Sequence, residues 1–149
     1  MHRVVITGVG CVSSLGLTAA EHIQATREGV SGLATVTSVD PDKLLVKMAG
    51  ELKNFDPADY LDRKTLNMVD RVAVLALVAG AEAIADSGLT FDDELSELTA
   101  VILGTGVGGM KTVDENFHRL YAEGATRLHP FVIPKLMANA AASQLTMAH

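Results

Sequence analysis

One stretch constrains the fold more than any other, because it joins a short apolar run to a cluster of glycines. The run covers Ala100 to Leu103, in a strand predicted over 99–103, and four glycines follow it within six positions: Gly104, Gly106, Gly108 and Gly109. A short β-branched run predicts a buried strand. Glycines after a strand indicate positive φ angles, or the close approach of a ligand or another backbone. Val107 stands between two glycines, so its side chain can face a cavity alone.

The N-terminus repeats this arrangement: residues 3–10 are largely apolar and include Gly8 and Gly10, and a first strand is predicted over residues 2–8. Neither run alternates apolar with polar residues. Strands of that kind are buried on both faces, as in parallel sheets covered by helices. The sequence therefore predicts an α/β protein with two strand-to-glycine turns on one side of its sheet.

Helix signals lie between and after these runs. Thr18 and Glu21 have the spacing of a capping box, and Gly29 follows as a stop signal. Asp70 precedes a long apolar pattern and is expected to cap it. The predicted elements are helices over 19–27, 61–69, 71–86 and 110–123, a short strand within 46–52, and an acidic turn over 92–97.

The last segment, residues 131–149, carries one charged residue and little polar surface. A helix that is apolar all round is buried or packs against another subunit. No polar tail or closing element follows it in the sequence. We therefore expect the chain to be the first part of a longer one.

Composition excludes several classes of function. The net charge of −6 argues against a nucleic-acid surface, and Lys and Arg do not cluster as they do at an anionic membrane patch. The longest apolar stretch, 72–84, is interrupted by Glu82 and is too short to span a bilayer. One cysteine, Cys11, suits the cytosol, and no targeting segment precedes the first run. A cytoplasmic protein is expected.

The residue patterns alone leave the function open. Gly104, Gly106 and Gly109 have the dinucleotide-binding spacing, with Glu123 near the distance of the expected acidic residue. The simpler interpretation is that the glycines permit tight packing of a strand on a helix. Cys11 has no histidine near it in sequence and is interpreted as a small buried residue. The histidines lack the spacing of a zinc site, so neither a metal nor a cofactor is expected.

Five segments together resemble one family, the β-ketoacyl-acyl-carrier-protein synthases, and most closely the elongating synthase II type. The opening residues 3–16 are similar to the start of these condensing enzymes, and residues 49–64 to their second segment. Val69-Asp-Arg71 resembles their "MDR" signature, and residues 104–109 their "GSGIGG" loop. Residues 129–134 with 138–142 are similar to "SPFFVP…PNMAAG". The likeness covers residues 1–149 in order as the N-terminal part of such a domain.

The resemblance implies a thiolase-like layered fold, of which this chain would be the incomplete N-terminal half, with a mostly buried mixed sheet covered by helices. It implies decarboxylative condensation of malonyl-carrier protein with an acyl thioester, acyl carrier protein as partner, and a homodimer through residues 129–147. The nucleophilic Cys and two catalytic His are expected after His149, so this chain alone should be inactive. Cys11 matches an ordinary apolar position of the family.

The resemblance further implies a gating loop over residues 104–109, with Gly104, Gly106, Gly108 and Gly109. The acyl pocket is expected to include Val107, Met110, Phe131 and Val132. The alternative is a non-catalytic chain-length partner subunit of a polyketide system, which lacks the nucleophilic Cys. A dinucleotide-binding domain remains a third interpretation.

Overall fold

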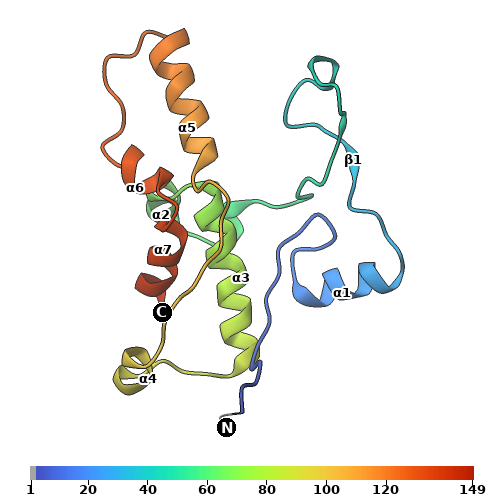
Figure 1. Ribbon diagram of the computed structural model, residues 1–149, viewed down its shortest axis with the longest axis vertical. Coiled ribbons are helices and arrows are strands. Elements are labelled where there is room, and N and C mark those ends of the chain that lie inside the picture. Colours follow the sequence, from blue (N-terminus) through green and yellow to red (C-terminus); the bar gives the residue numbers. More distant parts are fainter. Residues whose placement is uncertain (1–2) are drawn as a thin grey trace. The chain divides into compact units, whose positions relative to one another are not determined.

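The computed structural model describes residues 3–149, which divide into two compact units. The first unit comprises the described residues up to Phe55 together with Ala79–Leu89. The second comprises Asp56–Val78 and Thr90–His149. The longest helix, α3 (Arg71–Ser87), contributes residues to both units (Figure 1).

Helix α1 (Ala19–Arg27) of the first unit begins as the capping box predicts. The Thr18 hydroxyl accepts a hydrogen bond from the Glu21 amide at 3.2 Å. The Glu21 carboxylate in turn accepts one from the Leu17 amide at 2.7 Å. Gly29, with φ of 69°, follows the helix end. A left-handed residue of this kind stops a helix, so both predicted boundaries are confirmed.

The first unit also holds a small antiparallel sheet, β1 (Ala34–Thr35) with β2 (Met48–Ala49). Ala34 lies opposite Ala49, and Thr35 opposite Met48. The 3-10 turn η1 (Pro41–Lys43) lies between the two strands in sequence. The strand expected within 46–52 is confirmed, although only two of its residues pair.

Residues 8–11 lie against the C-terminal half of α3. A Cβ placed on Gly8 would meet the carbonyl oxygen of Ala83, and one on Gly10 would meet that of Ala79. Both positions therefore require glycine, because a backbone atom occupies the space of a side chain. Gly8 and Gly10 therefore allow the backbone after the first apolar run to pack closely against α3.

The second unit is helical. Besides the first half of α3 it contains the 3-10 turn η2 (Pro57–Asp59), α2 (Arg63–Met68), α4 (Asp93–Glu97), α5 (Met110–Phe117), the π-helical turn η3 (His118–Ala122), α6 (Val132–Leu136) and α7 (Ala140–Ala148). Its buried apolar residues are Val69, Ala73, Val74, Leu77, Val78 and Ala141. The two buried polar residues of the described chain, Asp70 and Thr112, lie in the same unit.

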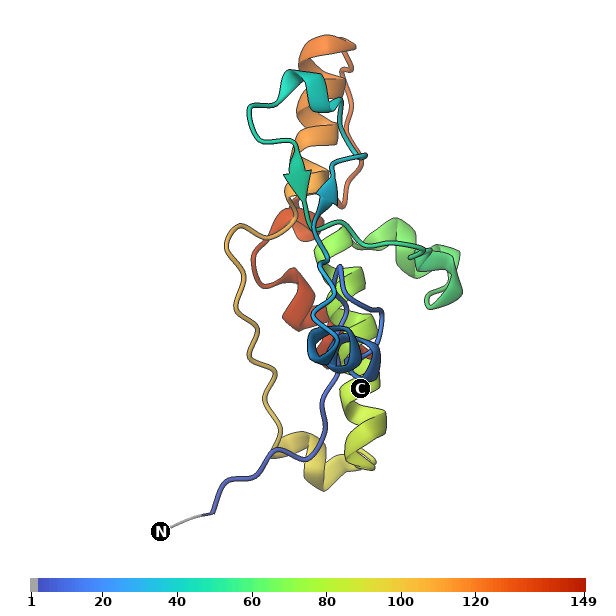
Figure 2. The same ribbon diagram turned by 90° about the vertical axis from the view of Figure 1, so that its right-hand side faces the viewer.

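The mostly buried mixed sheet is not formed within the described residues, and this corrects the sequence prediction. Residues 3–8 form no strand, and Ile6 is 86% exposed, while His2 of the predicted strand lies outside the described residues. Residues 99–103 run as a trace without an arrow in Figure 2, and Ile102 is 94% exposed. A strand needs a hydrogen-bonded neighbour. Neither run has one among residues 3–149.

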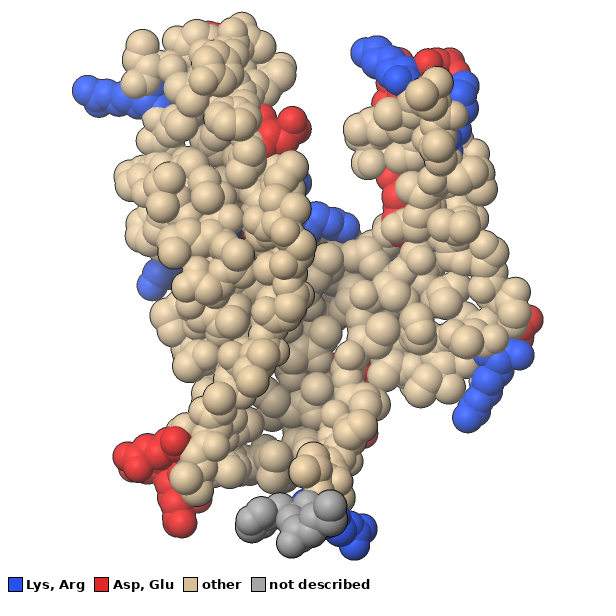
Figure 3. All heavy atoms as spheres, in the orientation of Figure 1, with Lys and Arg blue, Asp and Glu red and all other residues tan. Residues whose placement is uncertain are grey.

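The acidic turn over 92–97 is in fact the short helix α4. The Asp92 carboxylate caps it by accepting from the Leu95 amide at 2.8 Å. Its acidic side chains are the red patch at lower left in Figure 3, where Figure 1 labels α4. The predicted turn is wrong because acidic residues in a first turn favour a helix as well as a solvated loop.

The single helix expected over 131–149 is interrupted. Helix α6 ends at Leu136, Met137 is extended with ψ of 142°, and α7 begins at Ala140. Ala141 is buried, but Ile133, Met137 and Met147 are exposed in this chain. Among the described residues, none of the helices has the length and apolar character needed to cross a bilayer.

Candidate functional site

The glycine segment 104–109 consists of two structurally different halves. A Cβ on Gly104 or Gly106 would lie in open space. Gly108, with φ of 88°, and Gly109 instead lie against residues 135–138. The Gly109 amide donates to the carbonyl oxygen of Leu136 at 3.1 Å. One end of the segment is therefore packed and hydrogen-bonded, while the other has free space around it.

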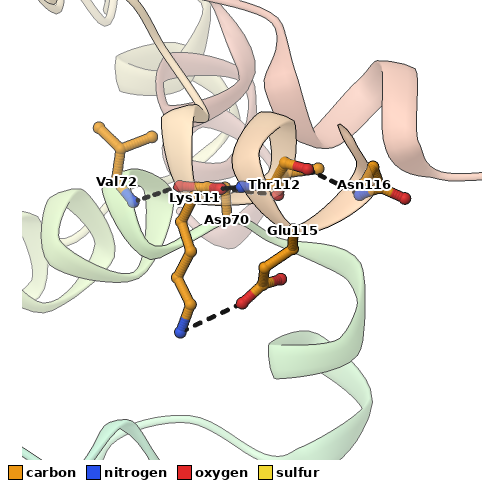
Figure 4. Close-up of polar contacts among 6 residues, drawn as sticks. All are labelled: Asp70, Val72, Lys111, Thr112, Glu115 and Asn116. Carbon is orange, nitrogen blue, oxygen red and sulfur yellow. Dashed lines mark hydrogen bonds and ion pairs between the residues drawn. The ribbon is translucent and has the colours of Figure 1, made fainter. Parts of the chain in front are cut away.

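A buried carboxylate, that of Asp70, lies beside the packed end, because a Cβ on Gly109 would be 3.1 Å from its Cγ. Figure 4 shows the contacts that this carboxylate makes. Asp70 is 4% exposed, and its Oδ1 accepts a hydrogen bond from the Val72 amide at 3.0 Å. Its Oδ2 accepts from both the amide and the hydroxyl of Thr112, at 2.8 and 2.6 Å. Thr112 is also 4% exposed. One side chain thus holds the first turn of α3 and the first turn of α5 together.

Polar groups continue along α5 from this point. Lys111 pairs with Glu115 at 3.6 Å on the exposed side of the helix, and the Asn116 amide donates to the carbonyl of Thr112 at 2.7 Å (Figure 4). The other amide atom of Asn116, Oδ1, is buried without a hydrogen-bond partner among the described residues.

Two cavities adjoin this cluster. The first, of about 230 Å³, is lined by residues that include Val69, Asp70 and Lys135. The second, of about 470 Å³, is lined by residues that include Asn116, Arg119 and His129. Their charged linings do not match the apolar walls that an acyl chain requires.

The structure brings the predicted acyl-pocket residues only partly together. Val132 lines the larger cavity. Val107 is 64% exposed, and Met110 and Phe131 are also exposed. Apolar side chains that face outward need a further surface to cover them before they can enclose a ligand. Their role in an acyl pocket therefore stays a prediction.

Cys11 is half-buried, and its amide donates to the Glu82 carboxylate at 2.8 Å. Among the described residues, no three His, Cys, Asp or Glu side chains gather in a group that could hold a metal ion. A serine–histidine contact that the sequence reasoning missed joins Ser13 Oγ and His22 Nδ1 at 2.8 Å. The same hydroxyl accepts from the Leu15 amide at 3.1 Å, so it shapes the turn before α1.

Two surface carboxyl groups have altered acidity. Hydrogen bonds from Ser38 and then Thr37 lower the pKa of Glu51 to about 2. The donors lie 2.8 to 2.9 Å from its oxygens. Hydrogen bonds from Thr65, and then Lys64, lower the pKa of Asp62, which caps α2. Both shifts are effects of turns and helix starts far in sequence from the glycine segment.

Comparison with known proteins identifies the family of this chain. The family model "Beta-ketoacyl synthase, N-terminal domain" matches residues 1–149. The chain belongs to this family. The expectation drawn from the five sequence motifs is thereby confirmed.

Relatives of this synthase domain are named 3-oxoacyl-[acyl-carrier-protein] synthase 2. The protein from Staphylococcus aureus (strain N315) is 35% identical over 145 residues, which are 97% of this chain and 35% of that protein. The one from Synechocystis sp. is 34% identical over 139 residues, which are 93% of this chain and 33% of that protein. The chain thus spans about a third of the length of these relatives.

Solved structures confirm the thiolase-like fold. A β-ketoacyl synthase from Burkholderia phymatum STM815 matches with a TM-score of 0.78 and 24% identity, over 99% of this chain and 36% of that one. The ishigamide ketosynthase/chain length factor matches with a TM-score of 0.76 and 24% identity, over 95% of this chain and 36% of that one. At this identity the likeness establishes the fold alone.

Sequence reasoning missed the contacts that Asp70 and Glu82 make with distant segments. Asp70 was predicted to cap α3 and does so, but its second oxygen serves a residue 42 positions away. Glu82 was noted only as an interruption of an apolar stretch. Its two oxygens accept from the amides of Cys11 and Ala19, both at 2.8 Å. The available signal was a carboxylate within the apolar stretch 72–84.

Proposed function

We propose that this chain provides the N-terminal part of a 3-oxoacyl-[acyl-carrier-protein] synthase that elongates fatty acyl chains. The observation that carries the proposal is the match of 97% of the chain to relatives named for that activity. The family match over residues 1–149 supports it independently.

In this proposal a cysteine thiolate attacks the acyl thioester of the carrier protein, and the carrier-protein thiolate leaves as the acyl-enzyme thioester forms. The malonyl thioester then loses CO2, and the electrons of the broken C–C bond form an enolate. The enolate carbon attacks the acyl thioester carbonyl, and the thiolate leaves as the new C–C bond is completed. The nucleophilic Cys and the two His that stabilise the enolate oxygen are proposed to lie after His149.

The described residues are assigned the recognition of the acyl chain. Residues 104–109 are the proposed gating loop, and Val107, Met110, Phe131 and Val132 the proposed pocket wall. The exposure of Val107 supports this assignment, because another surface must cover such a side chain. Residues 129–147 are the proposed homodimer contact, supported by the exposed apolar side chains of Ile133, Met137 and Met147.

Acyl carrier protein is the proposed partner, with acyl and malonyl thioesters as substrates. Support comes from a fold neighbour described as a type II polyketide acyl-carrier protein in complex with its ketosynthase, with a TM-score of 0.78. A second candidate function is a non-catalytic chain-length subunit, because another fold neighbour is a ketosynthase/chain length factor.

The test is a condensation assay on the complete protein with acyl- and malonyl-carrier protein. The proposed enzyme releases CO2 and forms 3-oxoacyl product, and mass spectrometry finds the acyl group on a cysteine other than Cys11. A chain-length subunit forms neither product nor acyl-enzyme. The chain of residues 1–149 alone is expected to yield no product above a no-enzyme control.

Val107→Trp tests the assignment of the gate. Each excluded CH2 removes about 0.8 kcal/mol of burial. Four excluded groups cost about 3 kcal/mol, which is roughly a hundredfold in kcat/KM for long primers relative to short ones. Val39→Trp, at an exposed position of the first unit, is the matched control. An unchanged long-to-short ratio in Val107→Trp would make Val107 a packing residue.

A further inference from the structure

The helix that follows the glycine segment has no cap of its own. Its N-cap residue is Gly109, which makes no side-chain hydrogen bond. The first amides of a helix need acceptors when they are buried. The Thr112 amide finds its acceptor in Asp70 Oδ2, on a segment 42 residues earlier in the sequence. The start of α5 is thus fixed by a side chain from the start of α3.

This attachment is stronger than an ordinary cap. Thr112 donates twice to the same oxygen, through its amide and its hydroxyl, and both residues are buried. Hydrogen bonds to a charged acceptor are roughly twice as strong as neutral ones. The other oxygen of Asp70 accepts from the Val72 amide, so the carboxylate cannot rotate without losing a bond. Gly109 lies directly alongside, where an added Cβ would be 3.1 Å from Asp70 Cγ.

The other half of the glycine segment is not packed against the described residues. Among residues 3–149, Gly104 and Gly106 have no neighbour that would limit a Cβ. A local hydrogen bond lies within this segment, from the Gly108 amide to the Thr105 hydroxyl at 3.3 Å. Val107 therefore stands between an unpacked end and a fixed end, so any movement of its side chain is expected to come from rotation at residues 104–107.

We propose that Asp70 and Thr112 are positioning residues that hold the fixed end of the glycine segment and thereby set how far Val107 can yield to an acyl chain. This inference rests on the proposed function, because it assigns Asp70 and Thr112 a part in acyl-length selection. Neither residue touches the substrate in this arrangement. They act through the position of α5 and Gly109.

The anchor itself is tested without substrate, by hydrogen–deuterium exchange of the full chain. Thr112→Val keeps the side-chain shape and removes only the hydroxyl donor, while Thr112→Ser keeps that donor. Thr26→Val removes a hydroxyl bonded within α1 at 2.8 Å and is the matched control. Exchange of the 109–112 amides should rise about tenfold in Thr112→Val, the scale of one hydrogen bond to a charged group. It should stay near wild type in Thr112→Ser and Thr26→Val.

The specificity role is tested in the complete protein by kcat/KM for primers of increasing length. Loosening the fixed end should let the Val107 side chain move further. The ratio of kcat/KM for long primers to kcat/KM for short primers should therefore rise by about three- to tenfold in Thr112→Val, which does not exceed the contribution of one hydrogen bond. Thr112→Ser should restore the wild-type ratio. A parallel fall for all primers would show a merely structural role and overturn the proposal.

The two assays separate the possible failures. Unchanged exchange at 109–112 in Thr112→Val overturns the anchor, whatever the enzyme does. If the wild-type protein forms no 3-oxoacyl product, the proposed function fails and the specificity role fails with it. The exchange result still decides whether the glycine segment is held at one end.

Discussion

Replacing Glu82 with glutamine should destabilise the first unit, although the two side chains have nearly the same shape. Both carboxylate oxygens of Glu82 are used as acceptors, one by the Cys11 amide and one by the Ala19 amide. Glutamine offers one oxygen and one NH2 group. Whichever way its amide is turned, one backbone N–H then faces another donor.

The cost follows from the number of bonds lost. One hydrogen bond to a charged acceptor contributes about 1.5–3 kcal/mol, and an unsatisfied buried donor adds to its loss. Since Glu82 is only part-buried and water can reach the site, we expect about 2 kcal/mol. For a chain of this size, that loss lowers Tm by about 4–8 °C.

Asp86→Asn is the matched control on the same helix. Within the part of the chain that the structure describes, one Asp86 oxygen is used, accepting from the Val9 amide at 2.9 Å, and the asparagine oxygen can replace it. Removing a negative charge near the end of α3 is also favourable by about 0.3–1 kcal/mol. Urea and thermal unfolding followed by circular dichroism should therefore find Asp86→Asn near wild type. Equal losses in the two variants, or none in Glu82→Gln, would refute the role given to the paired oxygens.

Two further predictions concern the first unit. Because the pKa of Glu51 is lowered from 4.5 to about 2, its hydrogen bonds to Ser38 and Thr37 stabilise the fold fully above about pH 4.5 and are lost as the pH falls toward 2. The Tm of Glu51→Gln should therefore fall less than that of wild type between these pH values, and identical pH profiles would contradict the assignment. Gly10→Ala should cost about 3 kcal/mol in urea unfolding, because its Cβ would meet the backbone of Ala79 and Ala83. Gly29→Ala should cost about 1 kcal/mol, because only its positive φ opposes a side chain, so a larger loss at Gly29 than at Gly10 would count against the packing argument.

The sequence predicted best those features whose causes lie within a few residues. The boundaries of α1 follow from Thr18, Glu21 and Gly29, all close to the helix itself. The start of α3 at Arg71 follows from Asp70 in the same way. A strand depends instead on a neighbour that its own residues do not specify. Residues 3–8 and 99–103 have strand-like composition, yet neither pairs within the described chain.

In the candidate site, too, local features were predictable from the sequence and long-range contacts were not. The glycine segment was evident from its composition, but its division into an unpacked and a fixed half was not. That division depends on Asp70 and on residues 135–138, which lie on either side of the segment in sequence. Contacts between residues that are far apart in the chain cannot be inferred from a single sequence. The buried Asp70–Thr112 contact therefore had no local signal beyond a capping aspartate.

Asp70 and Glu82 each accept a hydrogen bond from a backbone amide in the first turn of a helix, Thr112 in α5 and Ala19 in α1. The Thr18 hydroxyl serves the Glu21 amide at the start of α1, and the Ala19 amide is served by Glu82. At α5 the N-cap position itself cannot carry a side chain. A Cβ on Gly109 would meet the carbonyl oxygen of Lys135 and lie 2.8 Å from Leu136 Cα. The acceptor must therefore come from another segment.

This constraint gives a prediction opposite to the usual effect of a capping residue. Serine at an N-cap ordinarily matches or slightly exceeds glycine in stability, because its hydroxyl accepts from the helix amides. Gly109→Ser should instead cost about 2–3 kcal/mol in urea unfolding, since its Cβ would press on backbone that cannot move as a side chain can. It should also fail to rescue Asp70→Asn, although it brings a new acceptor to the start of the helix. A stabilised Gly109→Ser variant would mean that residues 135–138 can withdraw from the glycine segment, and that the end we regard as fixed is free.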